Sequence, residues 1–249
     1  MITHSKPWIV REEIKHITNF LKNDDLSTTK YNVVFEKNLK RKFKIKNAVL
    51  TKSGTHALIN AIKILGIKKN DEIILPSYVC KNVLDAIIIN GAIPIYCDIG
   101  DNWLITYENI KRCISNKTKC IIVVHTFGFA AKIEQIKKLK IPIIEDACQA
   151  IGLKIQKKYS GTVGDLGVYS FDSTKCMTTI NGGLLICNNK TYLKQFKKMK
   201  NYLDSSLENS FSSIQAKLGI SQLNRYDQFV RKRKLIYSKF YKELSNINS

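Results

Sequence analysis

Short apolar runs alternate with helix-like segments from residue 46 onward. Apolar runs of four to eight residues that are separated by helices are typical of strands buried on both faces of a parallel sheet. The pattern therefore predicts an α/β fold whose sheet is mainly parallel. The expected strands are NAVLT, DEIILPS, AIPIYCDI, CIIVVHTFG, IPIIEDA, GDLGVYSF and GGLLICN, and the expected helices between them include HALINAIKIL, YVCKNVLDAIIIN, TYENIKRCI and AAKIEQIKKLK.

The two ends of the chain differ from this alternating centre. Residues 1–30 are expected to form an N-terminal arm, with a short helix REEIKHITNFLKN and a polar turn. Residues 31–200 are assigned to one large domain. Residues 201–249 are basic and helical in pattern, with few strand signals, and are expected to begin a second, incomplete domain.

Lysine and arginine outnumber acidic residues by 41 to 20, which gives a net charge of +21. The lysines are spread along the whole chain, so a solvated basic surface is the simplest interpretation. Steering of an anionic small molecule is a second interpretation. Nucleic-acid binding is disfavoured because aromatic residues are not interleaved with the basic ones and no known reading module is present.

Seven cysteines occur without a CxxC pair or zinc-like Cys/His spacing, so no metal site is expected. Cys97, Cys120 and Cys187 lie inside apolar runs, where reduced cysteine packs as a small hydrophobe, and this favours a cytoplasmic protein. The N-terminus has no apolar core of a signal peptide, and no apolar run is long enough to span a membrane.

Three segments at expected strand ends carry candidate chemistry, because ligands of such sheets bind where strands end and helices begin. Ser53, Gly54 and Thr55 precede a helix and could bind a phosphate, although Ser and Thr at a helix start are usually only caps. Glu145 and Asp146 end an apolar run and could ligate a metal, act as an acid/base pair, cap a helix or hold a pyridine nitrogen protonated.

The third segment, YSFDSTK, ends at Lys175 between two strands expected to be buried. A lysine in a loop is usually a solvated surface residue. Here the surrounding Ser, Thr and Gly residues and the scarcity of other lysines favour a desolvated amine with a lowered pKa, which could act as a nucleophile.

Together these segments resemble the DegT/StrS-type nucleotide-sugar aminotransferases, within the aspartate aminotransferase-like pyridoxal-phosphate enzymes. The resemblance covers nearly all 249 residues, and the order and spacing of many segments carry it. These segments are DLSTTK, VVFEKNLKRKF, SGTHAL, DEIILPSY, GAIPIYCDI, VVHTFG, IEDACQAIG, GTVGDLGVYSF, STKCMTTINGG and QAKLGISQLNRYDQFVRKR.

The resemblance implies a role for each matching residue. Lys175 would be the catalytic lysine that forms a Schiff base with pyridoxal phosphate and then transfers a proton. Asp146 would hold the pyridine nitrogen, and Gln149 would contact the ring or its hydroxyl. The phosphate would be bound by Gly54, Thr55 and Ser170.

Three departures from the family pattern follow from the same alignment. Cys80 stands where an aromatic usually stacks on the cofactor ring, so Tyr78 is the candidate substitute. Glu208 and Ser210 stand where an asparagine and an arginine usually reach the neighbouring subunit, and a carboxylate there would repel a phosphate. The family usually continues into a small domain beyond the position of Ser249, so the chain is expected to be truncated.

The expected function is transfer of an amino group from glutamate or glutamine to a nucleotide-linked keto sugar by a homodimer, in cell-surface polysaccharide or amino-sugar biosynthesis. The sugar 3-dehydratases of the same family carry histidine in place of the lysine, so Lys175 argues against dehydration. A truncated chain that binds cofactor or a partner subunit without turnover remains the alternative.

Overall fold

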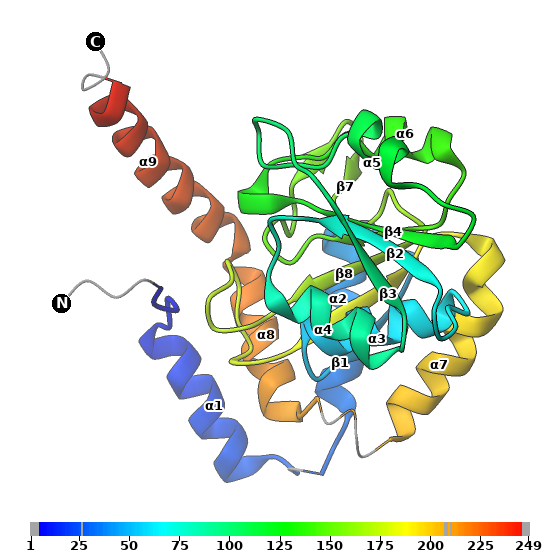
Figure 1. Ribbon diagram of the computed structural model, residues 1–249. Helices are drawn as coiled ribbons and strands as arrows, with labels where there is room; N and C mark the ends of the chain where they lie inside the picture. The colour runs from blue at the N-terminus through cyan, green and yellow to red at the C-terminus, as the bar shows by residue number, and fades with distance from the viewer. Residues whose placement is uncertain (1–4, 26, 207–208, 210, 246–249) are drawn as a thin grey trace.

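Helices cover both faces of a central seven-stranded sheet in the computed structural model, which describes residues 5–25, 27–206, 209 and 211–245 (Figure 1). The strand order is β1-β9-β8-β5-β4-β2-β3. The bounds are β1 Asn47–Thr51, β2 Glu72–Pro76, β3 Ile93–Cys97, β4 Thr118–Val124, β5 Ile143–Asp146, β8 Leu166–Ser170 and β9 Gly183–Cys187, and β6 Lys154–Ile155 and β7 Lys158–Tyr159 form a separate hairpin.

The predicted α/β class with a mainly parallel sheet is confirmed. Strands β3, β2, β4, β5 and β8 pair in parallel, whereas β9 runs antiparallel to both of its neighbours, β8 and β1. The carboxyl ends of β2, β4, β5 and β8 therefore meet at one edge of the sheet, where ligand sites form in this class of fold.

The helices between and around these strands follow the apolar spacing of the sequence. Their bounds are α1 Arg11–Asn23, α2 Lys30–Lys42, α3 Gly54–Ile64, α4 Lys81–Ile89, α5 Tyr107–Cys113, α6 Ile133–Ile136, α7 Leu193–Ser205, α8 Ser213–Asn224 and α9 Tyr226–Ser245. One face of the sheet packs against α3, α4 and α7, and the other packs against α2 and α8 at one end and α5 and α6 at the other.

Alternate residues of each strand face opposite cores, as strand geometry requires. Ile73 and Leu75 face α3 and α4, for example, whereas Ile74 between them faces the α5 and α6 side. Cys120 and Cys187 are fully buried, and burial raises the pKa of the Cys187 thiol to about 11. These thiols therefore pack as neutral apolar groups, as the sequence predicted.

One predicted helix is shorter than expected. The segment AAKIEQIKKLK forms only the single turn of α6 and a following 3₁₀ turn, Lys137–Leu139. Lys132 has φ −79° and ψ 63°, outside the helical region, so α6 begins only at Ile133. Lys140 adopts a left-handed φ of 57°, which ends the segment.

The two terminal regions lie on the same side of the molecule (Figure 1). Helix α1 packs along α8, and the Glu13 carboxylate pairs with the Arg225 guanidinium at 2.8 Å. Helix α9 extends away from the body, with residues 231–245 all exposed. The predicted boundary at residue 200 falls inside α7, and the division into an arm and two domains stays a prediction.

Within the described residues, no helix is both long and apolar enough to cross a lipid bilayer.

Candidate active site

A pocket opens at the carboxyl ends of β2, β4 and β5 and contains about 590 Å³ of empty space, including its open mouth. This volume lies within the usual range of roughly 300–1,000 Å³ for small-molecule sites. Six of the seven predicted site residues surround it directly. The lining residues are Gly54, Thr55, Leu58, Tyr78, Val79, Cys80, Asn82, Val83, Val124, Thr126, Asp146, Cys148, Gln149 and Lys175.

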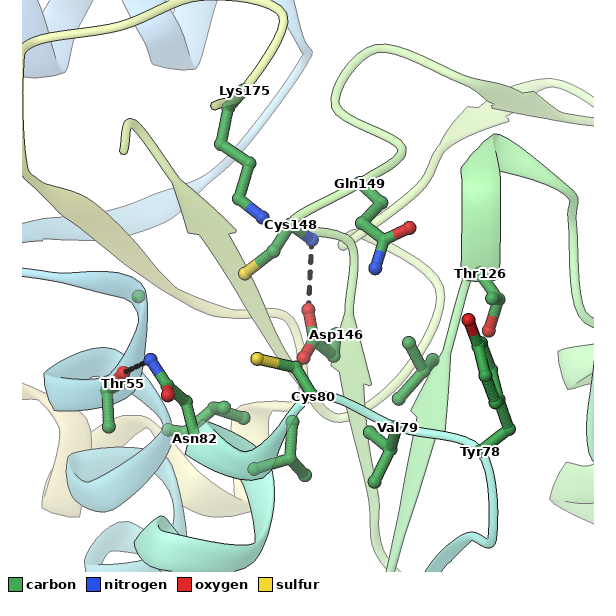
Figure 2. A pocket seen from close by; sticks show the side chains of 14 residues that line it. Thr55, Tyr78, Val79, Cys80, Asn82, Thr126, Asp146, Cys148, Gln149 and Lys175 are labelled. Carbon is green, nitrogen blue, oxygen red and sulfur yellow. Dashed lines mark hydrogen bonds between the residues drawn. The ribbon is translucent and has the colours of Figure 1, made fainter. Parts of the chain in front are cut away.

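The N-terminus of α3 forms one end of the pocket (Figure 2). The Ser53 hydroxyl caps this helix by accepting from the His56 N–H at 3.1 Å. The first N–H groups of a helix have no partner within the helix and carry partial positive charge, so this end favours an anion. The Thr55 hydroxyl accepts from the Asn82 amide at 3.0 Å, which ties the turn to α4.

Gly54 is required at this turn by close packing. A Cβ atom added at Gly54 would stand 2.9 Å from the Ser170 Cβ and 3.3 Å from the Cys148 Sγ. Ser170 itself is buried and does not line the pocket, but it lies against Gly54 from behind. The structure therefore brings together the predicted phosphate-binding residues.

Substitution of Gly54 by alanine is expected to destabilise the fold by about 1–3 kcal/mol, because the added methyl group overpacks the turn. It should also weaken binding of pyridoxal phosphate. Urea denaturation and a cofactor titration would measure the two effects. Gly100→Ala is the matched control for stability, since a Cβ at Gly100 meets its nearest atom at 3.4 Å. Equal stability of both variants would contradict the packing argument.

Asp146 ends β5 and directs its carboxylate into the pocket, where it is 5% exposed (Figure 2). One carboxylate oxygen accepts from the Cys148 N–H at 2.9 Å, which fixes the orientation of the side chain. The carboxylate faces the pocket. Burial raises the pKa of the neighbouring Cys148 thiol, and the Asp146 charge raises it further, so Cys148 stays a neutral wall residue.

Lys175 lies on the loop between β8 and β9, and its half-buried side chain extends toward Cys148 and Asp146 (Figure 2). Its backbone N–H donates to the Asp172 carbonyl at 3.0 Å, and Asp172 in turn accepts from Thr174, so a compact turn holds the lysine. An amine, a carboxylate and a helix N-terminus thus converge on one pocket, an arrangement suited to a phosphorylated aromatic aldehyde.

Gln149 and Tyr78 occupy the far side of the pocket from Thr55 (Figure 2). The Gln149 side-chain oxygen accepts from the Phe127 N–H at 2.8 Å, leaving its amide nitrogen toward the pocket. Tyr78 and Cys80 both line the pocket, and Tyr78 packs edge-to-face on Trp103 at 4.9 Å between ring centroids. That Tyr78 covers the cofactor ring therefore stays a prediction. Glu208 and Ser210 lie outside the described residues.

Glu145, the other half of the predicted carboxylate pair, points to the opposite face of β5 and is fully buried. Its oxygens accept from the His125 Nε2–H at 2.8 Å and from the N–H groups of Gly161, Val163 and Gly164 at 2.5, 2.9 and 2.8 Å. His125 Nδ1 accepts from Ala131, so its proton resides on Nε2. Glu145 therefore stabilises the end of β5 from the face of the sheet opposite the pocket.

Among the pocket residues that sequence reasoning missed are Asn82, Thr126 and Cys148, which carry an amide, a hydroxyl and a thiol. Cys148 could have been found, since it follows Asp146 by two residues at the strand end. Thr126 and Asn82 carry no sequence signal, because a Thr or Asn near an element end usually serves as a cap. Among the described residues, no group of three or more His, Cys, Asp or Glu side chains is arranged to hold a metal ion.

The model of the DegT/DnrJ/EryC1/StrS aminotransferase family matches residues 7–249. GDP-perosamine synthase of Escherichia coli O157:H7 is 31% identical, with 98% of this chain and 71% of the relative covered. A UDP-4-amino-4,6-dideoxy-N-acetyl-β-L-altrosamine transaminase of Campylobacter jejuni is 30% identical, with 98% and 69% covered.

A solved structure of the same fold is that of GDP-4-keto-6-deoxy-D-mannose-3-dehydratase of E. coli with bound hydrated pyridoxal phosphate. It has a TM-score of 0.85 and 22% identity, and the alignment covers 97% of this chain and 72% of that one. The shared fold alone does not separate amination from dehydration.

Proposed function

Because the chain belongs to the DegT/DnrJ/EryC1/StrS aminotransferase family of pyridoxal-phosphate-dependent enzymes, we propose that it transfers an amino group from an amino acid to a nucleotide-linked keto sugar. Glutamate or glutamine is the proposed donor, and cell-surface polysaccharide or amino-sugar biosynthesis is the proposed role. The observation that carries the proposal is the convergence of Lys175, Asp146 and the Gly54–Thr55 turn on one pocket.

The residues of the pocket fit the cofactor. Gly54 has no side chain, so the N-terminus of α3 can pack against Ser170 and still be reached by a phosphate in the pocket. Only one of the two Asp146 carboxylate oxygens accepts the Cys148 N–H. When bound, pyridoxal phosphate supplies an electron-withdrawing ring that stabilises negative charge on the substrate carbon.

The chain's own residues have separate tasks in this proposal. Lys175 Nζ would hold the cofactor and would move a proton to and from the substrate carbon. The Asp146 carboxylate keeps the pyridine nitrogen protonated. Gly54 and Thr55 hold the phosphate, Ser170 packs against Gly54 and supports this turn, and Gln149 and Tyr78 contact the ring region.

The identity of Lys175 favours amination over dehydration, since the dehydratases replace this residue with histidine. The net charge of +21 suits a nucleotide diphosphate, which a positive field attracts. The buried, reduced cysteines support a cytoplasmic location. We also propose that the active form is a homodimer, as the family resemblance implies.

The test is a donor half-reaction on the purified protein. Reconstitution with pyridoxal phosphate is expected to produce a visible absorption band, and glutamate or glutamine is expected to bleach it within the mixing time of a manual assay. A nucleotide-linked keto sugar should then restore the band. A stable band that no amino acid bleaches would instead indicate a cofactor-binding chain without turnover.

A further inference from the structure

The wall of the pocket beyond Asp146 carries a second group of residues, all of which except Tyr78 have no role in the proposed cofactor site. We propose that Thr126 and the rings of Tyr78, Trp103 and Phe127 form an acceptor subsite, which binds the sugar ring of the nucleotide-linked substrate. The proposal rests on the function proposed above and specifies which surface selects the acceptor.

The three rings form one contiguous cluster from three separate loops. The ring centroids of Tyr78 and Trp103 are 4.9 Å apart, those of Tyr78 and Phe127 are 6.0 Å apart, and those of Trp103 and Phe127 are 6.1 Å apart. The loops follow β2, β3 and β4. The interplanar angles of 65°, 50° and 72° make the cluster an angled surface rather than a flat stack.

These rings remain open to a ligand. Tyr78, Trp103 and Phe127 are 47%, 46% and 58% exposed, although a cluster of large aromatics normally buries itself. Tyr78 also lines the pocket that contains Lys175, so the exposed cluster is continuous with the reactive end of the site.

Two of the rings are held in costly backbone conformations. Trp103 has a φ of 65° and Phe127 a φ of 55°, and a left-handed conformation costs a bulky residue on the order of 1–3 kcal/mol. Hydrogen bonds hold both, from the Trp103 N–H to the Gly100 carbonyl at 2.9 Å and from the Phe127 N–H to Gln149 at 2.8 Å. The backbone that carries both rings is therefore held in place before a ligand binds.

Thr126 supplies an independent sign of a ligand. Its side chain is only 2% exposed and lines the pocket, on the same side as Tyr78 (Figure 2). Its hydroxyl oxygen finds no hydrogen-bond partner among the described residues. A buried hydroxyl without a partner costs about 1–3 kcal/mol, which a polar ligand group at this point would offset.

A buried hydroxyl beside exposed aromatic faces matches a sugar ring. A deoxy-hexose presents C–H groups to an aromatic face and hydroxyl groups at its rim. The amino-acid donor is charged and lacks an apolar face of this kind. The nucleobase is separated from the sugar by the diphosphate, whereas Tyr78 and Thr126 share one pocket with Lys175. The sugar is therefore the part of the substrate that this surface fits.

Two substitutions separate the acceptor subsite from the cofactor site. Trp103→Ala and Thr126→Val are each expected to lower the second-order rate constant of the acceptor half-reaction about tenfold, with GDP-4-keto-6-deoxymannose or its UDP-linked counterpart as probe. The donor half-reaction and cofactor affinity should not change. Phe129→Ala is the matched control, since Phe129 is 53% exposed on the same loop and should leave both half-reactions unchanged.

Thermal stability provides a second readout for Thr126. Thr126→Val removes a hydroxyl that has no partner in the described structure, so its melting temperature should equal or exceed that of the parent protein. A lower melting temperature together with slower donor and acceptor half-reactions would assign Thr126 a structural role and overturn its place in the subsite. A shift of Trp103→Ala to a smaller oligomer would assign the rings to a subunit interface instead.

Binding without turnover is tested by fluorescence. Trp8 and Trp103 are the two tryptophans, so Trp8→Phe leaves Trp103 as the sole source of tryptophan fluorescence. GDP-mannose or UDP-N-acetylglucosamine should change its emission, whereas GDP and UDP should not. An equal response to free nucleotides, or no response to any of the four, would overturn the proposal. This outcome is separate from a failed donor half-reaction, which would contradict only the proposed function.

Discussion

Replacement of Lys175 by alanine is expected to remove the visible absorption band of the bound cofactor and to lower the transamination rate by at least about a thousandfold. The proton transfer alone contributes roughly 10²–10⁴-fold in enzymes that use a positioned side chain. The covalent attachment to Nζ is lost in addition. Lys175 is the lysine among the pocket-lining residues, so no other described residue of the lining can replace it.

The measurement is a visible spectrum after reconstitution, followed by single-turnover assays with glutamate. Lys157→Ala is the matched control, because Lys157 is an exposed lysine on the β6–β7 hairpin and should leave the spectrum unchanged. Lys175→Arg keeps the positive charge and should also lose the band. Added methylamine is expected to restore part of the proton transfer in Lys175→Ala. A normal band in either Lys175 variant would exclude the proposed attachment.

Replacement of Glu145 by alanine is expected to produce the largest loss of stability, about 3–5 kcal/mol, because it leaves several buried donors without their acceptor. Glu145 is fully buried and accepts from the His125 ring and from three backbone N–H groups. Whole domains are stable by only about 5–15 kcal/mol, so the variant is expected to be close to unfolding at ambient temperature.

Guanidinium denaturation of Glu145→Ala, Glu145→Gln and Glu134→Ala would measure this effect. Glu134 is 50% exposed and pairs with Lys137 and Lys158 at 3.9 and 3.8 Å, so its removal should cost less than about 1 kcal/mol. Glu145→Gln keeps one acceptor oxygen and should fall between the two. Similar unfolding midpoints for all three variants would show that the buried network contributes little.

Much of the fold followed from the period of the apolar residues. The runs around Ile73, Ile121 and Ile144 had the length and β-branched composition of buried strands, and all became neighbours in the sheet. The reversed direction of β9 could not be predicted, because an apolar run such as GLLIC is compatible with either pairing direction. The shortening of α6 depended on the non-helical backbone of Lys132 and the left-handed backbone of Lys140, which no spacing rule describes.

Some features of the candidate site could likewise be predicted from the sequence, whereas others depended on tertiary packing. Lys175, Asp146 and Gly54 could be proposed from sequence because each lies at a strand end or helix start, where chain direction alone places it at one edge of the sheet. Glu145 and Asp146 point to opposite faces of the sheet because successive residues of a strand alternate between its two faces. Which of the two faces the pocket depends on what packs against each face of β5.

The sequence by itself therefore determined the class of fold, the family and the candidate cofactor residues that line one pocket, since these depend on local periodicity and on residue types at element ends. Only the tertiary structure decided that Thr126 lacks a partner and that Tyr78 joins Trp103 and Phe127. Those relations join loops after β2, β3 and β4, which are far apart in the chain. Contacts of that kind arise from the order of strands in the sheet, and the strand order is a property of the packed molecule.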